Sequence, residues 1–210
     1  MTSESAFRLR FPDDEGRLPW LPLLLDAYAV IDEGIAKAIA EAEKKKGLVL
    51  ACGKGCGNCC STHRDIPVYP LELVGIYWFV IEKLTQPLRA AVKGSLLGHR
   101  RGGPCPFLIE GACAIHPMRP AACRQFNVFG KQCEEGEDAY YTRRSDVLTP
   151  RREFADRAFS IMLPFYGVTG KKEMERAVKT RMIDNLARAL QLCNWQELPV
   201  RMEEFDISRR

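Results

Sequence analysis

The sequence predicts a mainly α-helical protein, with a helical shell around an irregular, cysteine-rich centre that holds at most a short β-hairpin. In several segments on both sides of this centre, apolar residues recur every three or four positions, as in amphipathic helices. The centre contains eight of the nine cysteines among glycines and prolines that interrupt regular elements. The 210 residues, 46% hydrophobic and 28% charged, have an ordinary globular composition. We expect one domain over 1–210, with a cysteine-cluster region at 52–133 and helical extensions at 18–47 and 149–195.

The longest predicted helix runs from Pro22 to Lys46. Gly47 follows it and is a suitable residue to end it, because glycine readily adopts the left-handed conformation that closes helices. One face should pack on the core because its apolar residues are spaced by three and four. These residues are Leu24, Tyr28, Ile31, Ile35, Ala38 and Ala42.

Prolines, which fit the first turn of a helix, indicate three further helices at 70–84, 87–96 and 120–126. Thr149 and Pro150 form a cap and first turn for another helix, reaching about Met162. A last long helix should follow Gly170. Its apolar face would carry Met174, Val178, Met182, Leu186, Leu190 and Cys193, so we expect Cys193 to be a core residue outside any site.

Several classes of protein are excluded by the composition. The net charge of +4 is modest and basic residues alternate with acidic ones, so a nucleic-acid surface is not indicated. Short basic pairs such as Arg143-Arg144 are interpreted as solvated helix ends, and the acidic run 13–16 as a solvated loop. No apolar run approaches the roughly 20 residues that span a bilayer, and no secretory signal is visible. We expect a cytoplasmic protein without nucleic-acid or membrane partners.

The cysteines point to metal chemistry. In a reducing compartment structural disulfides are rare, so clustered thiols are best explained as metal ligands. The candidate ligands are Cys52, Cys56, Cys59, Cys60, Cys105, Cys113, Cys123 and Cys133.

The first four candidates lie in Cys52-Gly-Lys-Gly-Cys56-Gly-Asn-Cys59-Cys60, where three glycines allow the backbone to curl. Cys56 and Cys59 have the C-x-x-C spacing that lets two thiolates share a metal or cluster. Adjacent side chains tend to diverge. The Cys59-Cys60 doublet therefore favours two centres, or one centre and a free thiol.

A hairpin around Glu110-Gly111 would determine which residues of the second group share a face. A two-residue turn pairs Leu108 with Cys113 and puts Cys105 on the face of His116. A three-residue turn through Ala112 instead moves Cys113 to the face of Cys105 and removes His116 from it. The sequence leaves both alternatives open, and with them the role of His116.

Three basic residues lie beside the cysteines in the sequence. Positive charge lowers the pKa of a thiol and offsets the charge of a thiolate-bound centre. Arg119 and Arg124 could serve in this way or be surface residues, and for Lys54 the surface interpretation is favoured.

The central region resembles a family, the bacterial zinc- or iron-chelating cysteine-cluster proteins named for a C-x-x-C-x-x-C-C signature. The resemblance covers about residues 52–133. Cys52 departs from the signature, because three residues rather than two separate it from Cys56. The matching residues are Gly55-Cys56-Gly-Asn-Cys59-Cys60, Pro70-Leu71-Glu72, Cys105-Pro106-Phe107-Leu108, Gly111-x-Cys113-x-Ile115, Arg119-Pro120 and Cys123-Arg124-x-Phe126.

The cysteines and this resemblance support three hypotheses. The first is an iron–sulfur protein, with a [4Fe–4S] cluster used in electron transfer or redox chemistry with a protein or redox partner. The second is a structural zinc protein without catalysis. The third is a cluster-dependent protein-modifying enzyme, since the signature is also similar to that of flagellin lysine methylases. No nucleotide or methyl-donor loop is visible, and the sequence assigns no catalytic residue.

Overall fold

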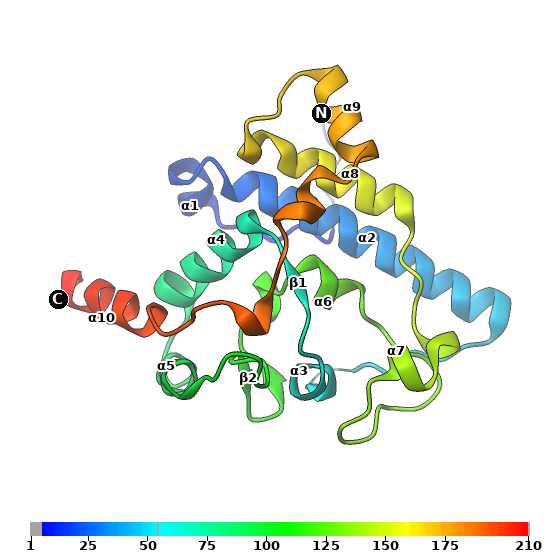
Figure 1. The fold of residues 1–210 in the computed structure, drawn as a ribbon, viewed down its shortest axis with the longest axis horizontal. Helices are drawn as coiled ribbons and strands as arrows, with labels where there is room; N and C mark the ends of the chain where they lie inside the picture. The colour runs from blue at the N-terminus through cyan, green and yellow to red at the C-terminus, as the bar shows by residue number, and fades with distance from the viewer. Residues whose placement is uncertain (1–5, 54, 210) are drawn as a thin grey trace.

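The structure, a computed structural model, describes residues 6–53 and 55–209. It confirms the mainly helical fold class: in this part of the chain the only sheets are two short antiparallel pairs of strands. The longest helix, α2 (Leu21–Lys46), crosses the molecule (Figure 1). Gly47 ends it in the left-handed conformation, with φ of 62°, as predicted. Its predicted face is directed into the core, where Leu24, Tyr28 and Ile31 are buried.

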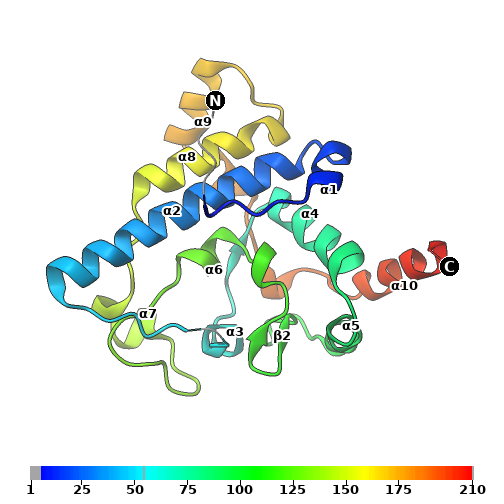
Figure 2. The ribbon, with the colours of Figure 1, turned by 180° about the vertical axis from the view of Figure 1, so that it is seen from behind.

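Helix α8 (Arg152–Met162) lies along α2, with α9 (Lys171–Lys179) beyond it on the same side (Figures 1 and 2). The contact between α2 and α8 is close at Gly34. A Cβ atom at this position would lie 2.6 Å from Cβ of Phe154, so the approach requires glycine. α8 begins two residues after the predicted Thr149-Pro150 start.

The prediction of a long last helix was wrong. α9 ends at Lys179, and Arg181 adopts a left-handed conformation with φ of 51°. The chain then continues through a 3₁₀ turn, Met182–Leu186, into the strand β4 (Arg188–Ala189). The apolar spacing continued past Arg181 because the turn and strand are also packed on the core, where Ile183 and Leu190 are buried. Cys193 follows a second 3₁₀ turn, Leu190–Leu192, and is not on a helix.

On the other side of α2, helix α4 (Pro70–Trp78) starts at the predicted proline and continues through one π-helical turn, Phe79–Lys83. Helix α5 (Leu88–Gly98) follows close to its predicted start. Helix α10 (Leu198–Ser208), which packs against α5, was not predicted. The acidic run predicted as a loop forms the short helix α1 (Pro12–Arg17), in which Asp14 is buried and paired with Arg17 and Lys83.

The short elements of the cysteine region lie on the side of α2 opposite α8 (Figures 1 and 2). Strand β1 pairs with β4, with Pro67 opposite Ala189. Strands β2 and β3 form the predicted hairpin. Helix α6 matches the predicted 120–126 helix to within one residue at each end. The bounds are α3 Asn58–Thr62, β1 Pro67–Val68, β2 Leu108–Ile109, β3 Ala112–Cys113, α6 Ala121–Gln125 and α7 Ala139–Thr142, with 3₁₀ turns at His116–Met118, Arg144–Asp146 and Leu163–Tyr166.

The main core joins the two sides of α2. It contains apolar residues from α2, α4 and α8 and also two thiols of the cysteine region, Cys60 and Cys105. No helix in the described ranges is long and apolar enough to cross a membrane.

Candidate metal centre

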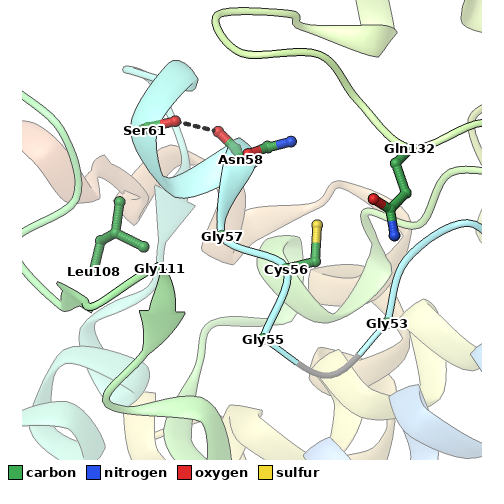
Figure 3. Close-up of a pocket in the computed structure, with 9 residues that line it drawn as sticks. All are labelled: Gly53, Gly55, Cys56, Gly57, Asn58, Ser61, Leu108, Gly111 and Gln132. Carbon is green, nitrogen blue, oxygen red and sulfur yellow. Dashed lines mark hydrogen bonds between the residues drawn. The ribbon is translucent and has the colours of Figure 1, made fainter.

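The first cysteines are held by a loop that leads into α3. This loop packs on the turn of the β2–β3 hairpin at Gly57, where a Cβ atom would lie 2.3 Å from the carbonyl oxygen of Gly111. Cys56 is exposed, and its sulfur points away from the loop, on the side where Asn58 and Gln132 lie (Figure 3). These residues line a hollow of about 380 Å³, which we call the glycine hollow. Because a Cβ atom at position 57 would clash with Gly111, only glycine allows the loop to pack this closely on the hairpin.

Seven of the eight predicted cysteines line one cavity of about 520 Å³, which we call the cysteine cavity. They come from the loop before α3, from α3 itself, from both sides of the hairpin and from α6. The structure thus brings together thiols separated by up to 71 positions in the sequence (123 − 52). The cavity is lined by Cys52, Cys56, Cys59, Cys60, Cys105, Cys113 and Cys123, and also by His116 and Arg119.

Cys60 interacts with more of these thiols than any other cysteine for which side-chain contacts are described. Its side chain is within hydrogen-bonding reach of Cys59, Cys105 and Cys113, and its carbonyl oxygen accepts a hydrogen bond of 2.9 Å from the N–H of Cys105. The expectation that Cys59 and Cys60 diverge was wrong. Both belong to the short helix α3, and both side chains line the same cavity.

These contacts and the differences in burial give the thiols different pKa values. A hydrogen bond from Cys60 and the charge of Arg119 lower the pKa of Cys59 to about 7, although burial opposes the shift. The same two influences lower the pKa of Cys113. Hydrogen bonding to its neighbours raises the pKa of Cys60, which therefore favours its protonated form. Burial raises the pKa of Cys123 well above its usual range. Cys59 and Cys113 are therefore the thiols most easily ionised for metal binding.

The hairpin has the two-residue turn of the first alternative. Glu110 and Gly111 have φ of 49° and 78°, and Leu108 is opposite Cys113. The expected separation of Cys105 from Cys113 does not follow, because the strand alternation stops before Cys105. Leu108 N–H donates to Cys105 O at 3.1 Å in a tight turn. This turn redirects the Cys105 side chain, so that Cys105 and Cys113 both meet Cys60.

His116 lines the cavity and remains exposed on one side, and partial burial of its ring together with Arg119 and Arg124 lowers its pKa. Its neutral form therefore predominates at neutral pH. A neutral imidazole is the form that binds metals. The structure leaves it at the rim of the cavity rather than among the buried thiols.

Cys133 lies outside the cysteine cavity but beside its entrance. Its side chain packs with Cys52 against the cluster of Val128, Ala139 and Val147, and burial raises the pKa of both thiols. Arg143 donates to the Cys133 sulfur at 3.6 Å and pairs with Glu137 at 2.8 Å. The interpretation of Arg143 as a solvated helix end was wrong. No local pattern marks this contact, because ten residues separate the two side chains.

Arg119 and Arg124 have different roles. Arg119 lines the cavity, and its buried Nε has no hydrogen-bond partner. Arg124 is buried, pairs with Asp32 of α2 at 2.6 Å and lies 3.9 Å above the ring of Tyr28. Its guanidinium also donates to the carbonyl oxygens of Pro117 and Arg119. Arg124 thus fixes the segment that carries Arg119, whereas Arg119 itself faces the thiols. Lys54 lies outside the described residues.

Glu72, for which the sequence predicted no role, connects two of the helices next to the site. Its fully buried carboxylate accepts hydrogen bonds from the N–H of Tyr69 at 2.9 Å and of Ala121 at 2.6 Å. These bonds join the N-terminus of α4 to that of α6, which carries Cys123. Burial raises the pKa of Glu72 to about 7. Glu72 is three residues after Tyr69, whose backbone N–H it caps, but the sequence signature of such a cap has a short polar residue where Tyr69 stands, so this contact was not predicted.

No three His, Cys, Asp or Glu side chains among residues 6–53 and 55–209 are arranged so that they could hold a single metal ion. Cys193 is not among the cavity-lining residues, and its sulfur donates to Ala189 O at 3.5 Å.

The comparisons with known proteins agree with the thiol-lined site. Residues 51–151 match the model of the CxxCxxCC family, described as a "Putative zinc- or iron-chelating domain", and this range includes all eight predicted ligands. No curated protein and no solved structure matches the chain. The match and the cysteine cavity lie in the same segment, so residues 51–151 are similar to the zinc- or iron-chelating domains of the CxxCxxCC family.

Proposed function

We propose that the domain binds an iron–sulfur cluster in the cysteine cavity and uses it for electron transfer or redox chemistry. The observation that carries this proposal is the convergence of seven cysteine side chains on one cavity of about 520 Å³. A polynuclear cluster uses several thiolates at separate iron atoms and needs enclosed space between them. The donor set of soft thiols fits such a group.

A single zinc ion fits the described geometry less well. Zinc takes four ligands, with sulfur at about 2.3 Å from the ion, and needs no cavity. Seven thiols exceed the four ligands of one zinc ion and also the four of one [4Fe–4S] cluster, so the preference for a cluster depends on the enclosed volume between the thiols. The proposed ligands are those of the sequence analysis, with Cys59, Cys60, Cys105, Cys113 and Cys123 inside the cavity and Cys52, Cys56 and Cys133 near its opening.

The charges around the site also support an anionic group. Thiolate ligands and sulfide make a cluster negative, and burial of that charge requires nearby donors or cations. Arg119 supplies a buried Nε that has no partner, and Arg143 supplies a guanidinium beside Cys133. Both would stabilise the cluster without serving as ligands.

Electron exchange requires a short path to the surface, and Cys56 provides one. Cys56 lines both the cysteine cavity and the glycine hollow and is exposed. A cluster held by this thiol would be separated from a docked redox partner by little more than the side chain.

Anaerobic purification, absorption spectroscopy and analysis of iron, zinc and acid-labile sulfide test the proposal. An iron–sulfur centre should give a brown protein with absorption near ~400 nm and with iron and sulfide in similar amounts. A colourless protein with stoichiometric zinc, no sulfide and no cluster after anaerobic reconstitution would overturn it. Cys193→Ala is the control, because that thiol does not line the cavity.

A further inference from the structure

A second cavity adjoins the cysteine cavity and is not explained by metal binding. It has a volume of about 470 Å³, within the range of small-molecule sites. Cys59 and Cys123 line both cavities, as do Ile66 and Phe126. We call it the tyrosine pocket, because Tyr140 and Tyr141 form its outer part. A molecule held there would touch side chains that also face the metal centre.

Most of the walls are apolar or aromatic. Ile66 and Phe126 lie on the inner side, and the Phe126 ring packs edge-on against His63 with ring centroids 4.5 Å apart. Tyr140 and Tyr141 are 48% and 77% exposed although both are large aromatic residues. Exposed aromatic side chains beside a cavity are typical of binding sites, where ring faces contact apolar or cationic groups.

The polar side chains of the pocket can accept hydrogen bonds from a ligand. Asp65 and Asp138 line it, and no lysine or arginine is among the described lining residues. His63 Nε2 is buried and lies 3.2 Å from Asp138 Oδ1 without making a hydrogen bond. The guanidinium carbon of Arg144 lies 4.7 Å from the centre of the Tyr140 ring, but Arg144 does not line the pocket. The pocket therefore carries negative charge between aromatic walls.

We propose that the tyrosine pocket binds a small organic cation, a protonated amine with an apolar body, next to the metal centre. Asp138 and Asp65 would accept hydrogen bonds from the ammonium group, and the rings of Tyr141 and Phe126 would contact the apolar part. An ammonium group would add charge-assisted hydrogen bonds to these carboxylates, whereas a neutral molecule of the same shape could offer only weaker neutral ones and an anionic molecule would be repelled. This site goes beyond the proposed function, because it does not depend on which metal the cysteines hold.

Benzylammonium is a suitable probe, with benzyl alcohol as its neutral counterpart and benzoate as its anionic one. Binding is measured by isothermal titration calorimetry and by chemical-shift changes in the metal-loaded protein, whose absorption spectrum is followed at the same time. Benzylammonium should bind at least about tenfold more tightly than benzyl alcohol, and benzoate should not bind. The spectrum should change on binding because Cys59 and Cys123 line both cavities.

Asp138→Asn is the informative variant. Asparagine retains an oxygen for the N–H of Tyr140, which Asp138 accepts at 2.9 Å at the start of α7, so the helix cap is preserved. The substitution should weaken benzylammonium about tenfold and leave benzyl alcohol unchanged. Asp65→Asn, at an exposed position, should weaken it up to about fivefold. Asp13→Asn, exposed on α1, is the matched control and should have no effect.

Equal affinity for benzylammonium and benzyl alcohol, or affinity unchanged in both pocket variants, would overturn the cation site. These results are independent of the metal analysis. A protein that loads a cluster but does not discriminate between the two probes refutes the pocket alone, and a zinc-loaded protein that does discriminate refutes only the cluster.

Discussion

The helices α2, α4 and α8 differ from the cysteine-bearing segments 48–69 and 99–133 in what holds them together. In the three helices, buried apolar side chains such as Leu24, Ile76 and Phe159 join elements that are regular by themselves. In the loop before α3 none of the described residues is buried, and its thiols converge with those of the hairpin and α6. Burial of apolar surface explains the first part of the molecule. In the second part Phe107, Ile115 and Met118 are also buried in the main core, but the loop before α3 depends on polar contacts and on what the thiols bind.

Removal of metal should have the largest effect and should separate the two parts. Chelation should lower the melting temperature by about 10 °C or more, because metal-binding energy contributes directly to the folding of such segments. Limited proteolysis with mass spectrometry should show cleavage first in 47–68 and 98–133, and α2 should remain protected. Unchanged melting and protease resistance in these segments would show that the cysteine region folds without metal.

Cys60→Ser should have the next largest effect, since Cys60 contacts three other thiols. We expect loss of most of the bound metal, measured by elemental analysis. A comparison of the metal lost from Cys59→Ser and from Cys60→Ser indicates the number of metal centres. Two centres predict losses of different portions of the metal, and one polynuclear cluster using both sulfurs predicts complete loss from each. Full occupancy in Cys60→Ser would contradict the central position of this thiol, and Cys193→Ala should retain its metal.

Glu72 links the two parts, and its effect should depend on pH. Its pKa is raised from 4.5 to about 7 in the folded protein, so the folded state holds the proton where the unfolded state has lost it. The stabilisation is complete below about pH 4.5 and is lost as the pH rises through about 7. It amounts to something on the order of 3 kcal/mol for a shift of this size.

Glu72→Gln should remove this pH dependence. Denaturant unfolding between pH 5 and 7.5, at constant metal occupancy, should show the wild type losing stability relative to the variant as the pH rises. Parallel curves for the two proteins would mean that Glu72 is ionised throughout this range.

Two glycine substitutions should show the smallest effects and test the comparison directly. Gly34→Ala places a Cβ 2.6 Å from Phe154 between α2 and α8, and should cost about 1–3 kcal/mol of stability without changing metal content. Gly57→Ala places a Cβ 2.3 Å from Gly111 O, and should reduce metal affinity by moving the loop that carries Cys56. Equal effects of both substitutions on metal content would show that the two parts are not separable in this way.

Local signals predicted most of the helices because each depends on residues close in sequence. Gly47 ended α2 as predicted, and prolines marked the starts of α4, α5 and α6 to within one or two residues. The failure after Lys179 has a physical reason. Apolar spacing reports which residues face the core, and the turn and strand around Arg188 face it as well as a helix would.

The sequence alone predicted the fold class and the resemblance of the cysteine region to the CxxCxxCC family, since composition, spacing and motif are local properties. The tertiary structure decided how the thiols of this region are arranged. It placed Cys60 among three other thiols, redirected Cys105 by a tight turn, and brought Arg143 to Cys133 and Glu72 to α6. It also built the tyrosine pocket from α3, α6 and α7 and the chain between them. Such contacts join residues from distant segments, and only the packing of those segments on α2 and on one another sets the distances between them.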